Sequence, residues 1–224
     1  MKKSSINLVI FDCDGVLIDS EVLSMQAWQS ILAKFNIAIT RRYFIANFLG
    51  KSMEHVRCKV EEDFDLSLTQ AIEDDFHTLL FQSFERQLTN TPGIIEVLSS
   101  LRVPFCLATS SSPERTKKAL QTTGLLHFFN DRIFTRSLVS RGKPAPDLFL
   151  HAAEVMKCKP HNCLVIEDSE PGLAAAQAAN MQCLHFIGGA HLHNLVDNTD
   201  NTIASWETFI KRFPDIMNMS TTNE

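Results

Sequence analysis

The sequence predicts an α/β protein with a doubly wound, mostly parallel sheet that is interrupted by an all-helical insert. Three observations lead to this fold class. Short apolar runs recur without alternating polar residues, which is typical of parallel strands buried on both faces. Segments with helical signals lie between these runs, so strands and helices alternate. One long segment near the N-terminus breaks the alternation, because it shows helical periodicity and no strand-like run.

Five apolar runs are predicted to form the strands, and each ends at polar or small residues. They are residues 8–11, 104–108, 132–134, 163–166 and 183–187. Three of the intervening helices carry proline in their first turn, where its missing N–H costs nothing. These helices are expected at residues 113–123, 146–157 and 171–180. Ser112 is the expected N-cap of the first of them.

The insert is predicted to contain about four helices between about Ser20 and Leu88. One apolar stripe comprises Trp28, Ile31, Leu32 and Phe35. A second stripe repeats every four residues up to Leu88, and Ser67-x-x-Gln70 before it has the pattern of a capping box. We therefore divide the chain into a sheet domain of residues 1–17 and 89–224 and a helical domain of residues 18–88.

The composition excludes several classes of protein. The 224 residues are 45% hydrophobic and 21% charged, as in folded globular chains. The net charge of -5 comes without a basic stripe, so nucleic acid is not an expected partner. The apolar runs are far shorter than the ~20 residues that a membrane span needs. No signal-peptide pattern follows Met1, so we expect a cytoplasmic protein whose six cysteines are reduced. We also expect the protein to be a monomer.

Acidic residues follow two of the predicted strands. Asp12 and Asp14 follow the first strand, and Glu167 and Asp168 follow the fourth. In an open α/β sheet the carboxyl ends of the strands face the ligand crevice, so these four carboxylates are expected to converge. Either pair alone could cap the next helix, but four together need a counter-charge. Mg2+ suits such oxygen ligands and also binds substrate phosphate.

Two further segments favour an anion at the same edge. Thr109, Ser110 and the serines after them lead from a strand into a helix, where hydroxyl and backbone N–H groups can cradle an anion. An ordinary serine-rich helix cap is the alternative. Lys143 lies in the loop Lys143-Pro-Ala-Pro and could meet the same anion, although an exposed, solvated lysine is the alternative.

These motifs, in this order, resemble the haloacid dehalogenase-like (HAD) hydrolase superfamily. The similarity is to its subgroup of β-phosphoglucomutase-like enzymes and sugar-phosphate phosphatases with a helical cap, and it covers about Ile6 to Pro214. The resemblance implies a Rossmann-like core, with residues 18–88 forming a cap over the active site.

The resemblance also implies a role for each motif residue. Asp12 matches the nucleophile that forms an aspartyl phosphate, and Asp14 matches the general acid and base. Mg2+ would be held by Asp12, Asp168 and the backbone carbonyl of Asp14, with Glu167 bound directly or through water. Phosphoryl oxygens would be bound by Thr109, Ser110 and Lys143.

The predicted activity is that of a Mg2+-dependent phosphatase acting on a small phosphorylated metabolite, such as a sugar phosphate or sugar-acid phosphate. The first alternative is a β-phosphoglucomutase-like phosphomutase. Ser24 and Met53 occupy the positions where that pattern has histidine and arginine, although Lys51 lies close to the second. The second alternative is a non-catalytic phosphate-binding module. The pattern His191-x-His193 is interpreted as an exposed loop and not as a metal site.

Overall fold

The computed structural model describes residues 5–192 and 199–218. A six-stranded parallel sheet lies at its centre, in the order β3-β2-β1-β4-β5-β6. The strands are β1 (Leu8–Phe11), β2 (Phe105–Thr109), β3 (Ile133–Thr135), β4 (Cys163–Glu167), β5 (Gln182–Phe186) and β6 (Thr202–Ile203). The five predicted strands are confirmed, whereas β6 was missed because two residues carry no periodicity.

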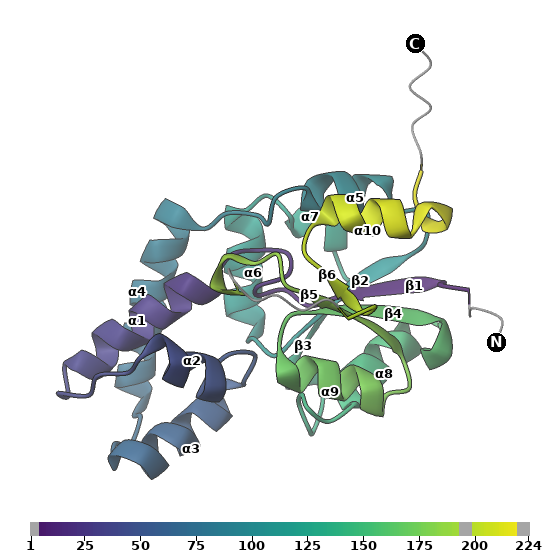
Figure 1. Cartoon of the computed structure of the whole chain (residues 1–224). Helices are drawn as coiled ribbons and strands as arrows, with labels where there is room; N and C mark the ends of the chain where they lie inside the picture. Colours follow the sequence, from purple (N-terminus) through teal and green to yellow (C-terminus); the bar gives the residue numbers. More distant parts are fainter. Residues whose placement is uncertain (1–4, 193–198, 219–224) are drawn as a thin grey trace.

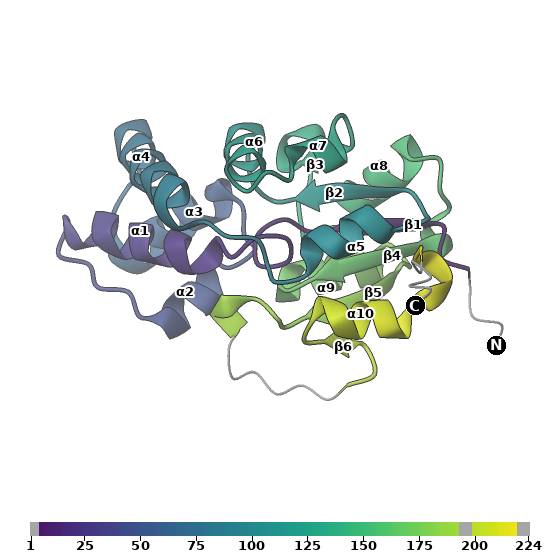
Figure 2. The same ribbon diagram turned by 90° about the horizontal axis from the view of Figure 1, so that it is seen from above.

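Helices cover both faces of the sheet (Figures 1 and 2). One face packs against α5 (Ile94–Ser100), α6 (Pro113–Thr122), α7 (Leu126–Phe129) and α10 (Trp206–Arg212), and the other against α8 (Asp147–Val155) and α9 (Glu170–Ala178). Alternate residues of a strand point to opposite faces of the sheet. In β1, Val9 and Phe11 pack into one apolar cluster, and Leu8 and Ile10 pack into the other. This two-sided burial explains why the strands read as continuous apolar runs. All six cysteines are free, as expected.

Short 3-10 helices complete the chain. They are η1 (Arg136–Leu138), η2 (Pro160–Asn162), η3 (Ala190–Leu192) and η4 (Pro214–Ile216). Among the residues that the structure describes, no helix is both long and apolar enough to cross a membrane.

The insert consists of four helices beyond the carboxyl ends of the strands (Figure 1). They are α1 (Glu21–Ala33), α2 (Arg41–Asn47), α3 (Met53–Phe64) and α4 (Gln70–Gln87). The predicted stripes meet where Trp28 stacks on Phe76, with ring centroids 4.1 Å apart. Phe35, at the end of its stripe, is 40% exposed. The predicted capping box is wrong, because Thr69 and not Ser67 is the N-cap of α4.

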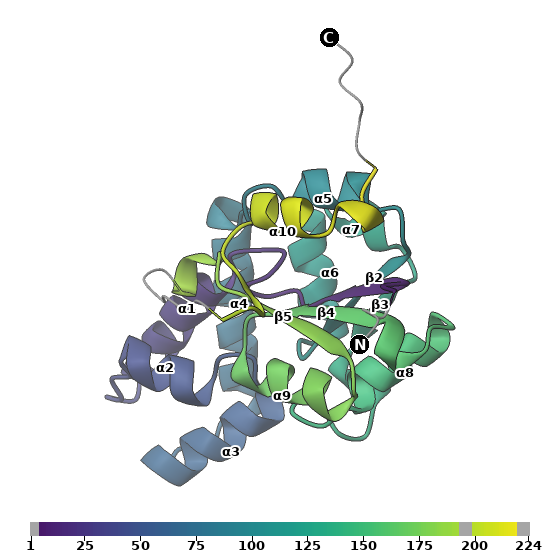
Figure 3. The ribbon, with the colours of Figure 1, turned by 45° about the vertical axis from the view of Figure 1, so that its right-hand side comes forward.

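The two chain segments that join the insert to the sheet lie side by side. Ile18 pairs with Asn90 in an antiparallel bridge. Backbone N–H groups of Asp19 and Thr91 donate to the carbonyls of Thr89 and Leu17, each over 3.0 Å. The insert therefore leaves the sheet and returns to it at neighbouring positions, which the view in Figure 3 shows from another side.

Candidate active site

The strand order places one crevice at the centre of the sheet. The chain runs outward from β1 to β3 on one side, then returns to β4 on the other, so β1 and β4 flank the point where the order reverses. Ligands of open α/β folds bind at the carboxyl ends of such strands. A cavity lies there, between this edge and the insert. Six predicted site residues line it: Asp12, Asp14, Thr109, Ser110, Lys143 and Glu167.

Lys143 is buried and ion-paired, so the alternative of an exposed lysine is wrong. Its side chain is 1% exposed. Its Nζ lies 2.5 Å from Asp12 Oδ1 and also 2.5 Å from Glu167 Oε1. A third bond runs to the carbonyl of Ala108 over 3.0 Å. Burial lowers the pKa of Lys143, but the two carboxylates outweigh burial and raise the pKa overall. Lys143 is therefore a fixed positive charge beside Asp12.

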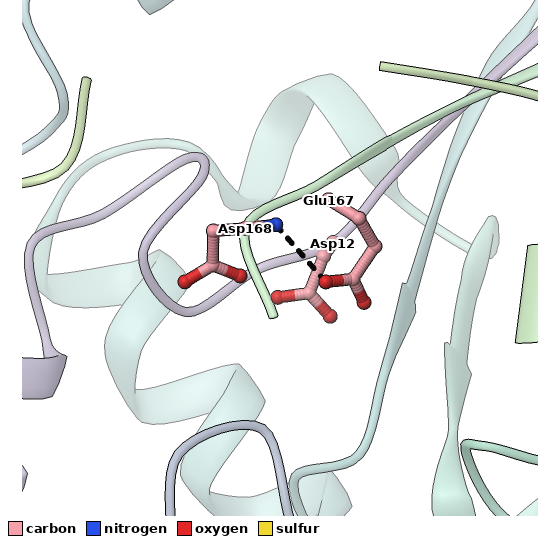
Figure 4. A group of neighbouring side chains, drawn as sticks. All are labelled: Asp12, Glu167 and Asp168. Carbon is pink, nitrogen blue, oxygen red and sulfur yellow. Dashed lines mark hydrogen bonds between the residues drawn. The ribbon is translucent and has the colours of Figure 1, made fainter. Parts of the chain in front are cut away.

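Glu167 has partners for both of its oxygens. Oε1 accepts from Lys143. Oε2 accepts from the backbone N–H of Asp168 over 3.0 Å (Figure 4), and from the backbone N–H and the hydroxyl of Ser169 over 3.0 Å and 2.9 Å. Gly172 leaves room for this carboxylate, since a Cβ there would lie 1.8 Å from Oε1. The carboxylate is thus held in one orientation by the start of α9.

Asp12, Glu167 and Asp168 form a buried acidic cluster whose oxygens lie within 4.8 Å of one another (Figure 4). Burial and the neighbouring carboxylates raise the pKa of Asp12 and of Asp168 well above the ordinary value, although Lys143 lowers both. Asp168 Oδ2 is buried without a hydrogen-bond donor among the described residues. Lys143 contacts two of these three carboxylates, those of Asp12 and Glu167, and the excess of negative charge suits a divalent cation.

Asp14 has entirely different surroundings, although it lies two residues from Asp12. Its carboxylate accepts from Ser20 Oγ over 2.5 Å, Ser111 Oγ over 2.7 Å and Arg115 Nη2 over 2.9 Å. Burial raises the pKa of Asp14, but Arg115 and the two hydroxyls outweigh it, and the net pKa is lowered. None of these three partners was predicted as a contact of Asp14. Their local sequence carries no signal for which distant residue each side chain meets.

The hydroxyl-rich segment after β2 reaches the cavity as expected. Thr109 is buried, and its Oγ1 accepts from the backbone N–H of Ser111 over 3.1 Å. Ser110 lies on the cavity wall and is partly exposed. Ser112 is confirmed as the N-cap of α6, since its side chain accepts from the N–H of Arg115.

The prediction of an exposed loop at His191 is wrong. His191 is only 5% exposed, and its Nε2 lies 2.8 Å from Asp168 Oδ2. Both atoms lack a partner with hydrogen-bonding geometry in the described part of the chain. Burial lowers the pKa of the His191 side chain. The backbone carbonyl of His191 accepts a hydrogen bond from Arg41 of α2 over 2.5 Å. His193 lies outside the described residues.

The insert forms the opposite wall of the cavity. Its lining residues include Glu21, Trp28 and His77, together with Ser24, Lys51 and Met53. Burial, with Asp14 nearby, raises the pKa of Glu21 to about 8. Glu21 is therefore a neutral acid at pH 7 while Asp14 is ionised, and the cavity contains carboxyl groups in both states.

Comparison with known proteins defines the class of this chain. Residues 6–180, more than half of the sequence, match the model of the haloacid dehalogenase-like hydrolase family. The chain belongs to this family and is an enzyme of the hydrolase class. The resemblance and the Rossmann-like fold that the sequence predicts are both confirmed.

Particular relatives include enzymes named for phosphate chemistry. The 6-phosphogluconate phosphatase of Escherichia coli (strain K12) is 26% identical over 215 residues, covering 95% of each chain. The beta-phosphoglucomutase of Bacillus subtilis (strain 168) is 27% identical over 188 residues, covering 77% of this chain and 80% of the other. A HAD family hydrolase from Deinococcus radiodurans R1 with bound phosphate and sodium is 28% identical, with a TM-score of 0.74 over 95% of this chain and 97% of that one.

Proposed function

We propose that the protein is a Mg2+-dependent phosphatase that hydrolyses a small phosphorylated metabolite, a sugar phosphate or sugar-acid phosphate, through an aspartyl phosphate. The observation that carries the proposal is the position of Asp12. Its carboxylate lies at the cavity, in contact with Lys143 and beside Glu167 and Asp168. A nucleophile that attacks a phosphate needs positive charge around it, and this edge of the sheet offers both a lysine and a cation-binding cluster.

The proposed chemistry uses the two aspartates in turn. An Asp12 oxygen attacks phosphorus, and the bond from phosphorus to the leaving oxygen breaks. Asp14 is ionised in the free protein, so it must take up a proton when the substrate binds, and it then gives this proton to the leaving oxygen. Asp14 then takes a proton from water, which attacks the aspartyl phosphate and releases inorganic phosphate. Thr109, Ser110 and Lys143 bind the phosphoryl oxygens during both steps.

The residues proposed to hold Mg2+ are Asp12, Asp168 and the backbone carbonyl of Asp14. The acidic cluster supports this set, and so does Asp168 Oδ2, which lies near His191 but accepts no hydrogen bond of good geometry among the described residues. Both Glu167 oxygens already have partners within the chain, which favours contact through water. When bound, Mg2+ reduces the repulsion between the anionic nucleophile and the phosphate and orients the phosphate.

The test is phosphate release from a panel of phosphorylated sugars, sugar acids and nucleotides, with Mg2+ and with EDTA. We expect hydrolysis of some panel members in Mg2+ and none in EDTA. The phosphoenzyme is expected in the wild type and absent in Asp12→Asn. Full activity in metal-free buffer would contradict the proposed use of the metal.

The phosphomutase is the second candidate, and the similarity to a β-phosphoglucomutase favours it. Ser24 and Met53, which the sequence aligns with the histidine and arginine of that pattern, both line the cavity. A thioether cannot anchor a second phosphate as a guanidinium does, so we expect water to reach the phosphoenzyme. Incubation with β-glucose 1-phosphate and catalytic glucose 1,6-bisphosphate should give little glucose 6-phosphate. Rapid isomerisation without phosphate release would favour the mutase.

Three broader predictions accompany this proposal. Residues 18–88 are proposed to act as a cap domain on a core of residues 1–17 and 89–224, and the chain is proposed to be a cytoplasmic monomer. Light scattering after size-exclusion chromatography tests the monomer. A non-catalytic phosphate-binding module would bind phosphate without turnover in the same panel.

A further inference from the structure

Two polar side chains on the cavity wall have buried nitrogen atoms without a partner in the described part of the chain. They are Arg115 Nε, from α6 of the sheet domain, and His77 Nδ1, from α4 of the insert. Buried polar groups are nearly always hydrogen-bonded in folded proteins. Both side chains line the same cavity, so we ask which ligand group would complete their hydrogen bonds there.

Arg115 has hydrogen-bonding capacity to spare. Its side chain is 14% exposed, and Nη2 alone bonds to a carboxylate, that of Asp14. A guanidinium has five N–H donors in a planar fork and no acceptor. The remaining donors match a planar group with two acceptor oxygens, which is a carboxylate.

His77 is held beside Arg115 by its own packing. Its ring contacts Phe76 and Phe81, with centroids 5.3 Å and 5.7 Å away. Burial, and then the charge of Arg115, lowers the pKa of His77, so its ring is neutral at pH 7 and can donate one hydrogen bond. Helices α4 and α6 lie side by side in both views (Figures 1 and 2).

The groups around this place favour a single negative charge. Trp28, Phe44, Phe48 and Val56 make much of the remaining wall apolar. Two acids lie near Arg115: Asp14 is already paired with it, and burial raises the pKa of Glu21 to about 8. A carboxylate can bind there without facing a second unpaired carboxylate.

We propose that Arg115 and His77 form a subsite for a carboxylate of the substrate, so that the preferred substrate is a phosphomonoester of a hydroxy acid. This inference rests on the proposed phosphatase function. Lys143, Thr109 and Ser110 are assigned to the phosphoryl group, whereas Arg115 touches Asp14, the residue assigned to the leaving oxygen. The subsite therefore recognises the leaving group and not the transferred phosphate.

Substrate pairs that differ in one group test the subsite with the Mg2+-loaded protein. Each pair compares a carboxylate with a primary alcohol: 6-phosphogluconate with glucitol 6-phosphate, and 3-phosphoglycerate with glycerol 3-phosphate. The readout is the ratio of kcat/KM for the two members of a pair. We expect the wild type to prefer the carboxylate in at least one pair, by about tenfold or more.

Two variants remove the subsite while sparing the rest of the cavity. Arg115→Lys keeps a positive charge near Asp14 but loses the fork, and we expect the ratio to fall by about 10- to 100-fold. His77→Phe keeps the ring and its packing but loses Nδ1, and we expect a fall of roughly 2- to 10-fold. Lys117→Gln is the matched control, because it removes an exposed charge from the same helix and should leave the ratio unchanged.

Binding measurements separate failure of this inference from failure of the proposed function. Calorimetry with Asp12→Asn measures Kd for both members of a pair without turnover, and tighter binding of the carboxylate is expected. Equal Kd values, or equal losses for both members in Arg115→Lys, would mean that Arg115 only positions Asp14, and the inference would be wrong. Preferential binding without hydrolysis in the wild type would instead overturn the phosphatase and keep the subsite.

Discussion

The two walls of the cavity differ in how far their polar groups are satisfied within the chain. On the sheet wall, Lys143 and Glu167 each have several partners, and α9 fixes the Glu167 carboxylate. On the part of the wall that helices form, which we call the helical wall, His77 of the insert and Arg115 of α6 in the sheet domain have buried nitrogen atoms without partners among the described residues. Groups that carry out chemistry must be positioned before the substrate arrives, whereas groups that recognise a substrate can be completed by it. In our proposal, the side chains that carry out the reaction are thus distinct from those that select the substrate, although both line one cavity.

The largest expected effect comes from the sheet wall, in Asp12→Asn. Loss of the nucleophile should lower kcat by more than about 10⁴-fold. In metal-free buffer at pH 7 the same variant should unfold at a higher temperature than the wild type. The pKa of Asp12 is raised in the folded wild type, so ionised Asp12 lowers the stability of that protein at pH 7. In the variant, Glu167 still pairs with Lys143. A lower melting temperature for Asp12→Asn would show that Lys143 needs both carboxylates.

Asp14→Asn should have the opposite effect on stability. Its ionised form is stabilised by Arg115 and two hydroxyls, and this stability is present above the unfolded-state pKa and lost as the pH falls. We expect the substitution to cost about 1–3 kcal/mol at pH 7 and to lower kcat by roughly 10²–10⁴-fold. Urea unfolding and steady-state kinetics check both values. Near-wild-type turnover would mean that Asp14 is not the acid.

Mg2+ should stabilise the protein through the sheet wall. At about 100 times Kd, a ligand of the folded state adds about 2.7 kcal/mol. We expect the melting temperature to rise with Mg2+ concentration in the wild type and to rise much less in Asp168→Asn. Asp147→Asn is a suitable control, because its carboxylate lies outside the acidic cluster. An equal rise in Asp168→Asn would place the metal elsewhere.

The helical wall should affect the pH dependence of stability through Glu21. The pKa of Glu21 is about 8 in the folded state, against an ordinary value of 4.5. The unfolded chain therefore releases this proton first, and stability due to Glu21 is lost as the pH rises from about 4.5 to about 8. In metal-free buffer, urea unfolding should show a loss of up to a few kcal/mol that is absent in Glu21→Gln. Parallel curves for the two proteins would show that Glu21 does not carry this proton.

The sequence predicted the sheet wall far better than the helical wall. Asp12, Thr109 and Glu167 follow apolar runs directly, and parallel strands bring their carboxyl ends to one edge. Arg115 and His77 lie on helices whose patterns identify a buried face but not the distant residue that each side chain meets. His191 follows the last long strand after two glycines, and its polar surroundings gave no sign that the chain would fold it onto Asp168. The capping box failed because the motif does not decide between nearby hydroxyls, and Thr69 took the place of Ser67.

The antiparallel bridge between Ile18 and Asn90 has a consequence for how such a chain can change over evolution. Its two residues are opposite each other, so the start and end of the insert are only about 5 Å apart. A connection of about two to five residues closes such a gap in ordinary hairpins. The sheet therefore places no demand on the length or shape of what lies between these points, and domains tolerate insertions at such sites. Residues 19–89 can in this sense be exchanged as a unit, and new selectivity can arise in this way if the replacement keeps a donor to Asp14 in the place of Ser20.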